Sequence, residues 1–106
     1  MVLASEVAWY ARAMDRSSDI SAIEEVSIPR GWMFRCDLAG GGETEVRLDW
    51  ADYDHWCPGG GTTPSRVAEI VILVMFEHGA TVPASFDAAR VRHVVPEADK
   101  LITSLM

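Results

Sequence analysis

The segment from Asp49 to Cys57, with the sequence DWADYDHWC, carries the densest group of side chains that could do chemistry or recognition. Asp49 and Asp52 are residue types that cap a short helix, and three large aromatic residues follow one another at intervals of three. On such a helix we expect the aromatic side chains to lie on one side, with carboxylates around them that attract a basic partner. The segment predicts a partner-binding patch made of Trp50, Asp52, Tyr53, Asp54 and Trp56.

The alternative is that these aromatic side chains close the open end of the hydrophobic core, which is their commonest use in a small domain. The substitution Trp56→Ala separates the two interpretations. A binding patch predicts lost partner affinity with an almost unchanged circular dichroism spectrum and melting temperature. A large drop in the melting temperature would assign Trp56 to the core.

The same segment holds residue types that ligate metal ions, but their spacing does not define a site. A calcium loop needs a glycine at its turn and a final glutamate, and Thr63 or Ser65 stands where that glutamate should be. A zinc site would need two further ligands from distant histidines. We therefore expect no metal and no cofactor. The weak candidates for a metal site are Asp52, Asp54, His55 and Cys57.

Other catalytic patterns are also weak. The run 58–64 (PGGGTTP) leads into a helix start but lacks the lysine and the spacing of a phosphate-binding loop. Cys57 lies two residues from His55, and that proximity does not define a nucleophile with its base. Because no further nucleophile motif stands out, we expect that the protein is not an enzyme.

The acidic composition limits the classes of binding partner that the protein is expected to have. Sixteen Asp and Glu stand against nine Lys and Arg among 106 residues, for a formal net charge of −7. A charge of this sign repels nucleic acid and anionic membranes and favours basic partners, so we expect no direct nucleic-acid binding. The longest uncharged apolar run, Ile70–Phe76, is too short to cross a membrane. The two cysteines form no disulfide framework and no signal peptide is visible, which predicts free thiols in the cytoplasm.

The secondary structure predicted before residues 49–57 determines where this segment lies in the fold. Leu3–Met14 has the periodicity of an amphipathic helix, and residues 24–28 predict a short strand ended by the turn at Pro29. Residues 32–50 predict a hairpin around Gly40–Gly42, because apolar and polar residues alternate on both sides.

The hairpin leaves two registers open. Cys36 opposite Val46 would put like charges opposite one another, because Arg35 would then face Arg47. Cys36 opposite Leu48 places Arg35 across from Asp49, Asp37 across from Arg47, and Phe34 across from Trp50. Unlike charges favour this second register by roughly 0.2–1 kcal/mol for each pair.

A central helix is predicted over residues 64–78, with Thr63 as its N-cap, Pro64 in its first turn, and His78 and Gly79 at its end. Between Val67 and Phe76 only Glu69 is polar. A helix that is apolar all round is buried in its own domain or shared with a second subunit, so a homodimer through helix 64–78 is one prediction.

Two further short helices follow. The first is capped by Ser85 or Asp87 and reaches His93, and the last begins at Pro96 with Ala98, Leu101, Ile102 and Leu105 on one face. The sequence as a whole predicts one α+β domain over residues 1–106. Its small antiparallel sheet of two or three strands packs on helix 64–78, between helices at both ends of the chain.

Size, charge and the aromatic segment together favour a small acidic protein–protein interaction module. An inhibitor, immunity or regulatory protein of a bacterium or phage would have this character. The alternatives are a small-ligand or metal-binding protein that uses the segment 49–57, and a self-associating structural subunit built around the apolar helix.

Overall fold

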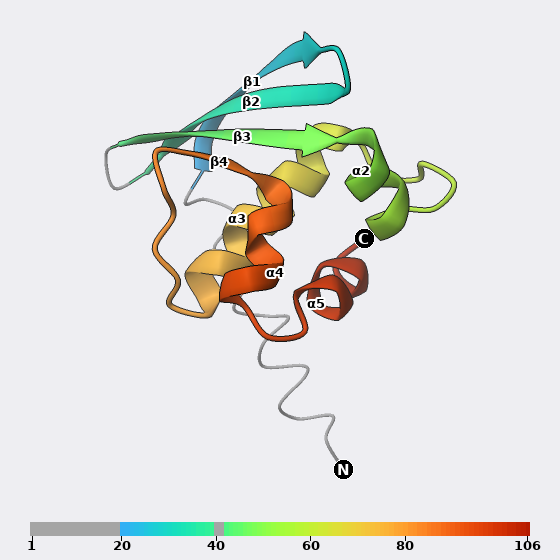
Figure 1. Ribbon diagram of the computed structural model, residues 1–106. Coiled ribbons are helices and arrows are strands. Elements are labelled where there is room, and N and C mark those ends of the chain that lie inside the picture. The colour runs from blue at the N-terminus through green and yellow to red at the C-terminus, as the bar shows by residue number, and fades with distance from the viewer. Residues whose placement is uncertain (1–19, 40–41) are drawn as a thin grey trace.

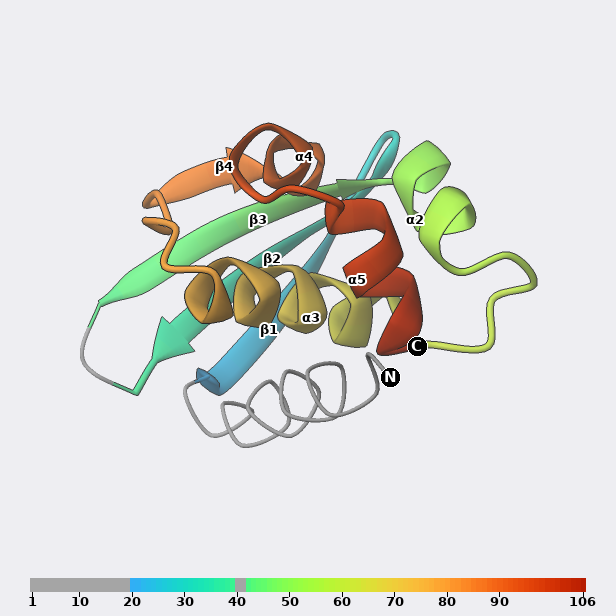
Figure 2. The same ribbon diagram turned by 90° about the horizontal axis from the view of Figure 1, so that it is seen from below.

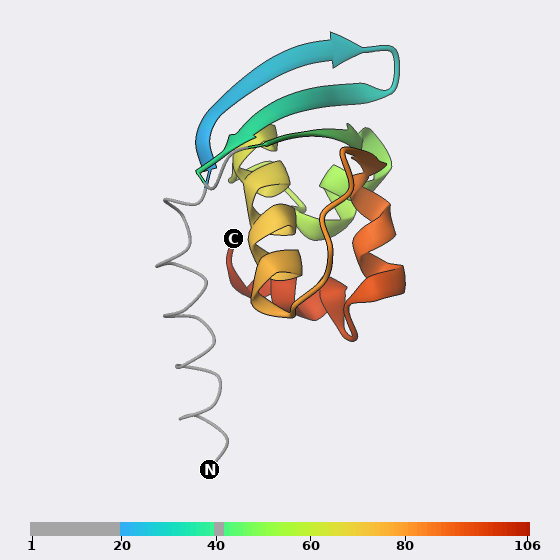
Figure 3. The same ribbon diagram turned by 90° about the vertical axis from the view of Figure 1, so that its left-hand side faces the viewer.

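The computed structural model describes residues 20–39 and 42–106, so the helix predicted over Leu3–Met14 lies outside the described residues. A four-stranded sheet lies on one side of the described chain and the helices lie on the other (Figures 1 and 3). The predicted α+β class is confirmed. The elements are β1 (Ile20–Ile28), β2 (Gly31–Leu38), β3 (Glu43–Asp49), α2 (Trp50–Trp56), α3 (Pro64–Glu77), β4 (Ser85–Asp87), a 3-10 turn (Ala88–Arg90), α4 (Val91–Val94) and α5 (Ala98–Ser104).

The sheet is mixed and has one strand more than predicted. Its order is β1-β2-β3-β4, with antiparallel pairing among the first three strands and parallel pairing between β3 and β4. The strand predicted over residues 24–28 is confirmed as the end of the longer β1. The sequence prediction missed β4, because a three-residue strand that pairs with residues some forty positions earlier leaves no local pattern.

Ser85 or Asp87 is predicted to cap a short helix, and the structure corrects this, because Ser85 begins β4. Asp87 precedes the 3-10 turn, but its side chain makes no capping hydrogen bond. Its carboxylate instead accepts a hydrogen bond of 3.0 Å from the Arg47 Nε on β3. The ion pair thus ties β4 to β3 in addition to the backbone pairing.

The register of the β2–β3 hairpin differs from both predicted registers. Cys36 lies opposite Thr44, so every pair is shifted toward a tighter turn, in which the Leu38 N–H donates to the Gly42 carbonyl at 2.9 Å. Charge pairing still holds at one position, because Arg35 faces Glu45 and their side chains are 3.3 Å apart. The prediction failed because it did not count Thr44 as buried.

Thr44 is buried despite its polar side chain, with 1% of its surface exposed. Its hydroxyl donates a hydrogen bond of 2.6 Å to the Pro83 carbonyl, which satisfies the group inside the protein. With Thr44 on the inner face, the tight register buries Phe34, Cys36, Val46 and Leu48 together against the helices.

Helix α3 confirms the predicted central helix almost residue for residue. Thr63 is its N-cap and accepts from the Arg66 N–H at 3.3 Å, and Pro64 is its first residue. At the other end His78 is the C-cap, and Gly79 follows in the left-handed conformation at φ 69°. Figure 2 shows α3 running beneath the sheet, with α5 alongside it.

The apolar residues of α3 are buried within one chain. Every residue from Ile70 to Met75 has at most 1% of its surface exposed. A homodimer through this helix would need an exposed apolar face, and residues 70–75 offer none, so that basis for the predicted dimer is lost. Among the residues that the structure describes, no helix has the length and apolarity needed to span a membrane.

Candidate partner-binding site at α2

Helix α2 forms directly at the end of β3 because Asp49 caps it. The Asp49 carboxylate accepts from the Ala51 N–H at 2.8 Å, as the sequence predicted. The Trp50 N–H still continues the sheet pattern and donates to the Arg30 carbonyl at 2.9 Å. The start of the helix is thus anchored to the β1–β2 turn, which fixes the position of Trp50.

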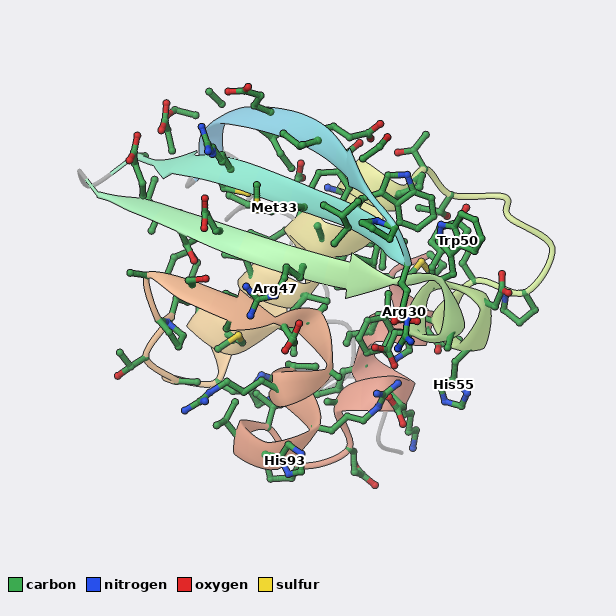
Figure 4. All side chains as sticks on the ribbon, turned by 45° about the horizontal axis from the view of Figure 1, so that its top comes forward. Arg30, Met33, Arg47, Trp50, His55 and His93 are labelled. Atoms are coloured by element: carbon green, nitrogen blue, oxygen red, sulfur yellow. The ribbon has the colours of Figure 1, made fainter. Side chains whose placement is uncertain are left out.

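Trp50 is the most exposed large hydrophobic residue in the described chain, with 58% of its surface accessible. Its ring lies against that of Trp32 at a centroid distance of 6.3 Å. Trp32 in turn packs edge-on against Tyr53 at 5.3 Å. Figure 4 shows Trp50 at the end of the sheet, beside Arg30 and away from Met33 and Arg47 on the outer face of the strands. We call Trp32, Trp50 and Tyr53 the aromatic patch.

Tyr53 is held in place by the loop that follows α2. Its hydroxyl donates to the Thr62 carbonyl at 2.5 Å, and the Thr62 N–H donates to the Cys57 sulfur at 3.3 Å. Burial and the neighbouring Cys57 raise the pKa of Tyr53. The glycine-rich loop therefore supports the patch.

Trp56 does not belong to the aromatic patch, and this corrects the predicted binding residues. Its side chain has 0% exposure and lies in the core. The reason is the pitch of the helix, since three residues turn the direction of the side chain by about 60° short of a full circle. Over the six residues from Trp50 to Trp56 this grows to about 120°, so the two rings leave α2 in different directions.

Asp52 also points away from the aromatic patch, toward a network that joins the three short helices. Its carboxylate accepts from the Arg92 guanidinium of α4 at 2.8 Å. The same guanidinium donates to Asp99 of α5 at 2.7 Å, and Asp99 also accepts from the Trp56 indole N–H at 2.7 Å. Arg92 lies over the Trp56 ring at 4.7 Å from its centroid. We call Asp52, Trp56, Arg92 and Asp99 the arginine network.

The charges of the arginine network shift its titration. Burial alone would raise the pKa of Asp99, but the hydrogen bonds from Trp56 and Arg92 and the charges of Arg92 and His55 outweigh it, so the pKa is lowered. Asp99 is thus bonded to both Trp56 and Arg92, and Asp52 is bonded to Arg92, which leaves Asp52 little capacity to bind a partner protein.

The carboxylates that remain beside the aromatic patch are Asp49 and Asp54. Both residues are exposed. Asp54 lies one helical turn from Trp50, a spacing at which side chains on a helix are neighbours. Trp50 and Asp54 are exposed and Tyr53 contacts Trp32, so their role in binding stays a prediction, whereas Asp52 and Trp56 are engaged by residues of α4 and α5.

The weak metal candidates are not brought together. Asp52 is bonded to Arg92, His55 lies 3.5 Å from Asp99, and the Cys57 sulfur accepts from the loop backbone. Within the described residues, no group of three or more His, Cys, Asp or Glu side chains is arranged to hold a metal ion. Both cysteines are free thiols and buried. Burial, with the charges of Glu69 and Asp37, raises the pKa of the Cys36 thiol to about 11, which makes it a poor nucleophile.

Sequence reasoning missed three residues that shape this region. Trp32 of β2 contacts Trp50 and Tyr53, and Arg92 and Asp99 are hydrogen-bonded to residues of α2 that lie about forty positions earlier. Alternation along the hairpin marked Trp32 as an inner-face residue but could not show which ring it meets. No local pattern connects Arg92 with Asp52.

Comparison with known proteins adds no relative: no protein-family model matches the chain, and neither a curated protein nor a solved structure matches it.

Proposed function

We propose that the protein is a small acidic interaction module that binds a basic surface of another protein through the aromatic patch, with Asp49 and Asp54 at its rim. The observation that carries the proposal is the 58% exposure of Trp50, whose position is fixed by the hydrogen bond from its backbone N–H to the Arg30 carbonyl and by its contact with the Trp32 ring. An ordered and exposed tryptophan offers contact area at little cost in conformational entropy, which is the character of a binding hot spot.

Charge supports the choice of partner. The chain carries a formal net charge of −7, and the two rim carboxylates beside Trp50 are exposed. Complementary potentials accelerate association and align the partner, and this contribution weakens as salt rises. An inhibitor, immunity or regulatory protein is the functional class that fits, because such proteins act by covering a surface of their target.

The test is affinity capture from the lysate of the host, with the tagged full chain as bait and three baits compared. Wild-type protein should recover a basic protein in stoichiometric amount, and Trp50→Ala should lose it. Val94→Ala is the matched control, because Val94 is also an exposed apolar residue at 42% but lies on α4, away from the aromatic patch. Its capture should equal that of the wild type.

The salt dependence of binding is a second measurement on the same proteins. Raising the salt concentration from about 0.05 to 0.5 M should reduce the association rate, because the rim charges are screened. Equal recovery by wild-type protein and Trp50→Ala would contradict the proposal, and so would an acidic partner whose binding is insensitive to salt.

A further inference from the structure

In the part of the chain that the structure describes, the edge of the sheet at β1 is unpaired, and this edge lies apart from the aromatic patch. Within the described chain β1 pairs only with β2, so its other side has no neighbouring strand. Five consecutive residues, 21–25, are exposed, which means that both faces of the strand are open there as well. They lie toward the β2–β3 turn, whereas Trp50 follows the opposite end of β3.

The pairing pattern identifies the backbone groups that point outward. The Leu38 N–H and the Arg30 carbonyl both bond toward β3, so the even-numbered residues of β2 face β3 and the odd-numbered ones face β1. Arg35 and Met33 are opposite Glu24 and Val26. The N–H and C=O groups of Ile23, Glu25 and Ser27 therefore point to the open edge.

A hollow lies on the outer face of the sheet beside this edge. This open hollow has a volume of about 520 Å³, and its lining includes Ala22 and Glu24 of β1, with Arg35, Asp37, Glu43 and Glu45 on the neighbouring strands. Four carboxylates thus face one guanidinium, and Arg35 is already paired with Glu45 at 3.3 Å. Glu24, Asp37 and Glu43 form no ion pair with another described residue.

We propose that β1 accepts an extended, basic segment of a partner protein as a fifth strand, and that the hollow receives one of its Lys or Arg side chains. The outward backbone groups would supply the hydrogen bonds, as in other cases of strand addition. Side chains of the added strand alternate, so every second one would stand beside Ala22 or Glu24, about 5 Å away and at the rim of the hollow.

Charge selects this occupant over a second copy of the chain. The antiparallel self-pairing that overlaps all nine residues of β1 would put Glu24 opposite Glu24 of the second copy. Like charges directly opposite destabilise a pair of strands, and acidic residues on an edge oppose self-association. A basic segment meets the same carboxylates favourably. This inference does not rest on the aromatic patch, since it uses another surface.

The probe is a nine-residue peptide of alternating Lys and Val with blocked ends, titrated into the full chain, and the same peptide with Glu in place of Lys is the control. The Lys peptide should bind and the Glu peptide should not. Addition of the Lys peptide should slow amide hydrogen exchange at Ile23, Glu25 and Ser27, whose N–H groups point outward. The already paired Glu24 and Val26 should change much less.

Two variants separate backbone pairing from side-chain contact. Glu25→Pro removes one outward N–H. The bonds to β2 stay intact because the Glu25 N–H points away from β2, and proline is tolerated at such edge positions. It should weaken peptide binding at least tenfold relative to Glu25→Ala, with a similar circular dichroism spectrum. Should Glu25→Pro not fold, the exchange measurement on the wild-type chain decides alone.

Three results would overturn the proposal. The first is equal affinity of Glu25→Pro and Glu25→Ala for the peptide. The second is protection of residues 50–54 in place of β1. The third is concentration-dependent protection of the β1 amides without peptide, which would assign the edge to a second copy. Trp50→Ala should bind the peptide normally, so failure here and failure of the aromatic patch are distinguishable.

Discussion

The two sides of helix α2 carry similar residue types, tryptophan and aspartate, but these residues are exposed on one side and engaged by the rest of the domain on the other. On one side Trp50 is largely exposed beside Asp49 and Asp54, which are exposed as well. On the other side Trp56 is buried and its indole N–H, like Asp52, is engaged by residues of α4 and α5. A tryptophan with an adjacent carboxylate therefore does not by itself mark a binding surface. What distinguishes the sides is whether other elements of the same chain already satisfy these groups.

The largest expected effect is on the buried side. Trp56→Ala should lower the free energy of unfolding by about 3–5 kcal/mol, because it leaves a large cavity and removes the hydrogen bond to Asp99. Urea denaturation of wild-type and variant protein measures this difference. A change below about 1 kcal/mol would show that Trp56 is not part of the core.

The second-largest loss of stability is expected on removal of the Arg92 guanidinium, which joins the three short helices. Arg92→Leu leaves Asp52 and Asp99 without their shared donor and removes the contact with the Trp56 ring. We expect a loss of about 1–3 kcal/mol, moderated by the partial exposure of these groups. Arg90→Leu is the control, since Arg90 is exposed on the preceding turn, and it should change the stability by less than about 0.5 kcal/mol.

Lowering the pH should reduce the stability of the folded protein, because the contribution of ionised Asp99 is lost. The folded protein lowers the pKa of Asp99 relative to the unfolded chain, so ionised Asp99 contributes stability above its unfolded pKa. That contribution is lost as the pH falls from about 4 through the lower, folded pKa. Melting temperatures of wild-type protein and Asp99→Asn should thus differ at pH 7 and converge at acid pH. A difference that stays constant down to about pH 2 would contradict the assignment.

The sequence predicted the elements with strong local signals and missed contacts between distant segments. Helix α3 was found because Thr63, Pro64 and Gly79 mark its ends, and α2 was found through Asp49. The hairpin was found as well, but its register depended on a buried threonine whose partner, Pro83, lies 39 residues later. Strand β4 and the arginine network were missed for the same reason, since their partners are remote in sequence.

For the candidate site, residue types directed the prediction to the segment 49–57. The geometry of α2 determines which of its side chains reach the surface. Trp50 and Asp54 are exposed and Tyr53 contacts Trp32, and the binding role predicted for these three residues stays a prediction. Trp56 was included because intervals of three were treated as one helical side, whereas a 3.6-residue repeat carries the third aromatic residue round to the core. Trp32 was recognisable as an inner-face residue, but its contact with Trp50 required the tertiary structure.

The most direct test compares binding and stability in the same pair of variants. The partner recovered by affinity capture would be titrated calorimetrically into wild-type protein, Trp50→Ala and Arg92→Leu, and the melting temperature of each would be recorded. We predict that Trp50→Ala weakens binding by about 30-fold or more, equivalent to about 2 kcal/mol, with little change in melting temperature. Arg92→Leu should lower the melting temperature and retain the affinity. The reverse pattern, with affinity lost in Arg92→Leu and kept in Trp50→Ala, would contradict the division of α2 into a binding side and a structural side.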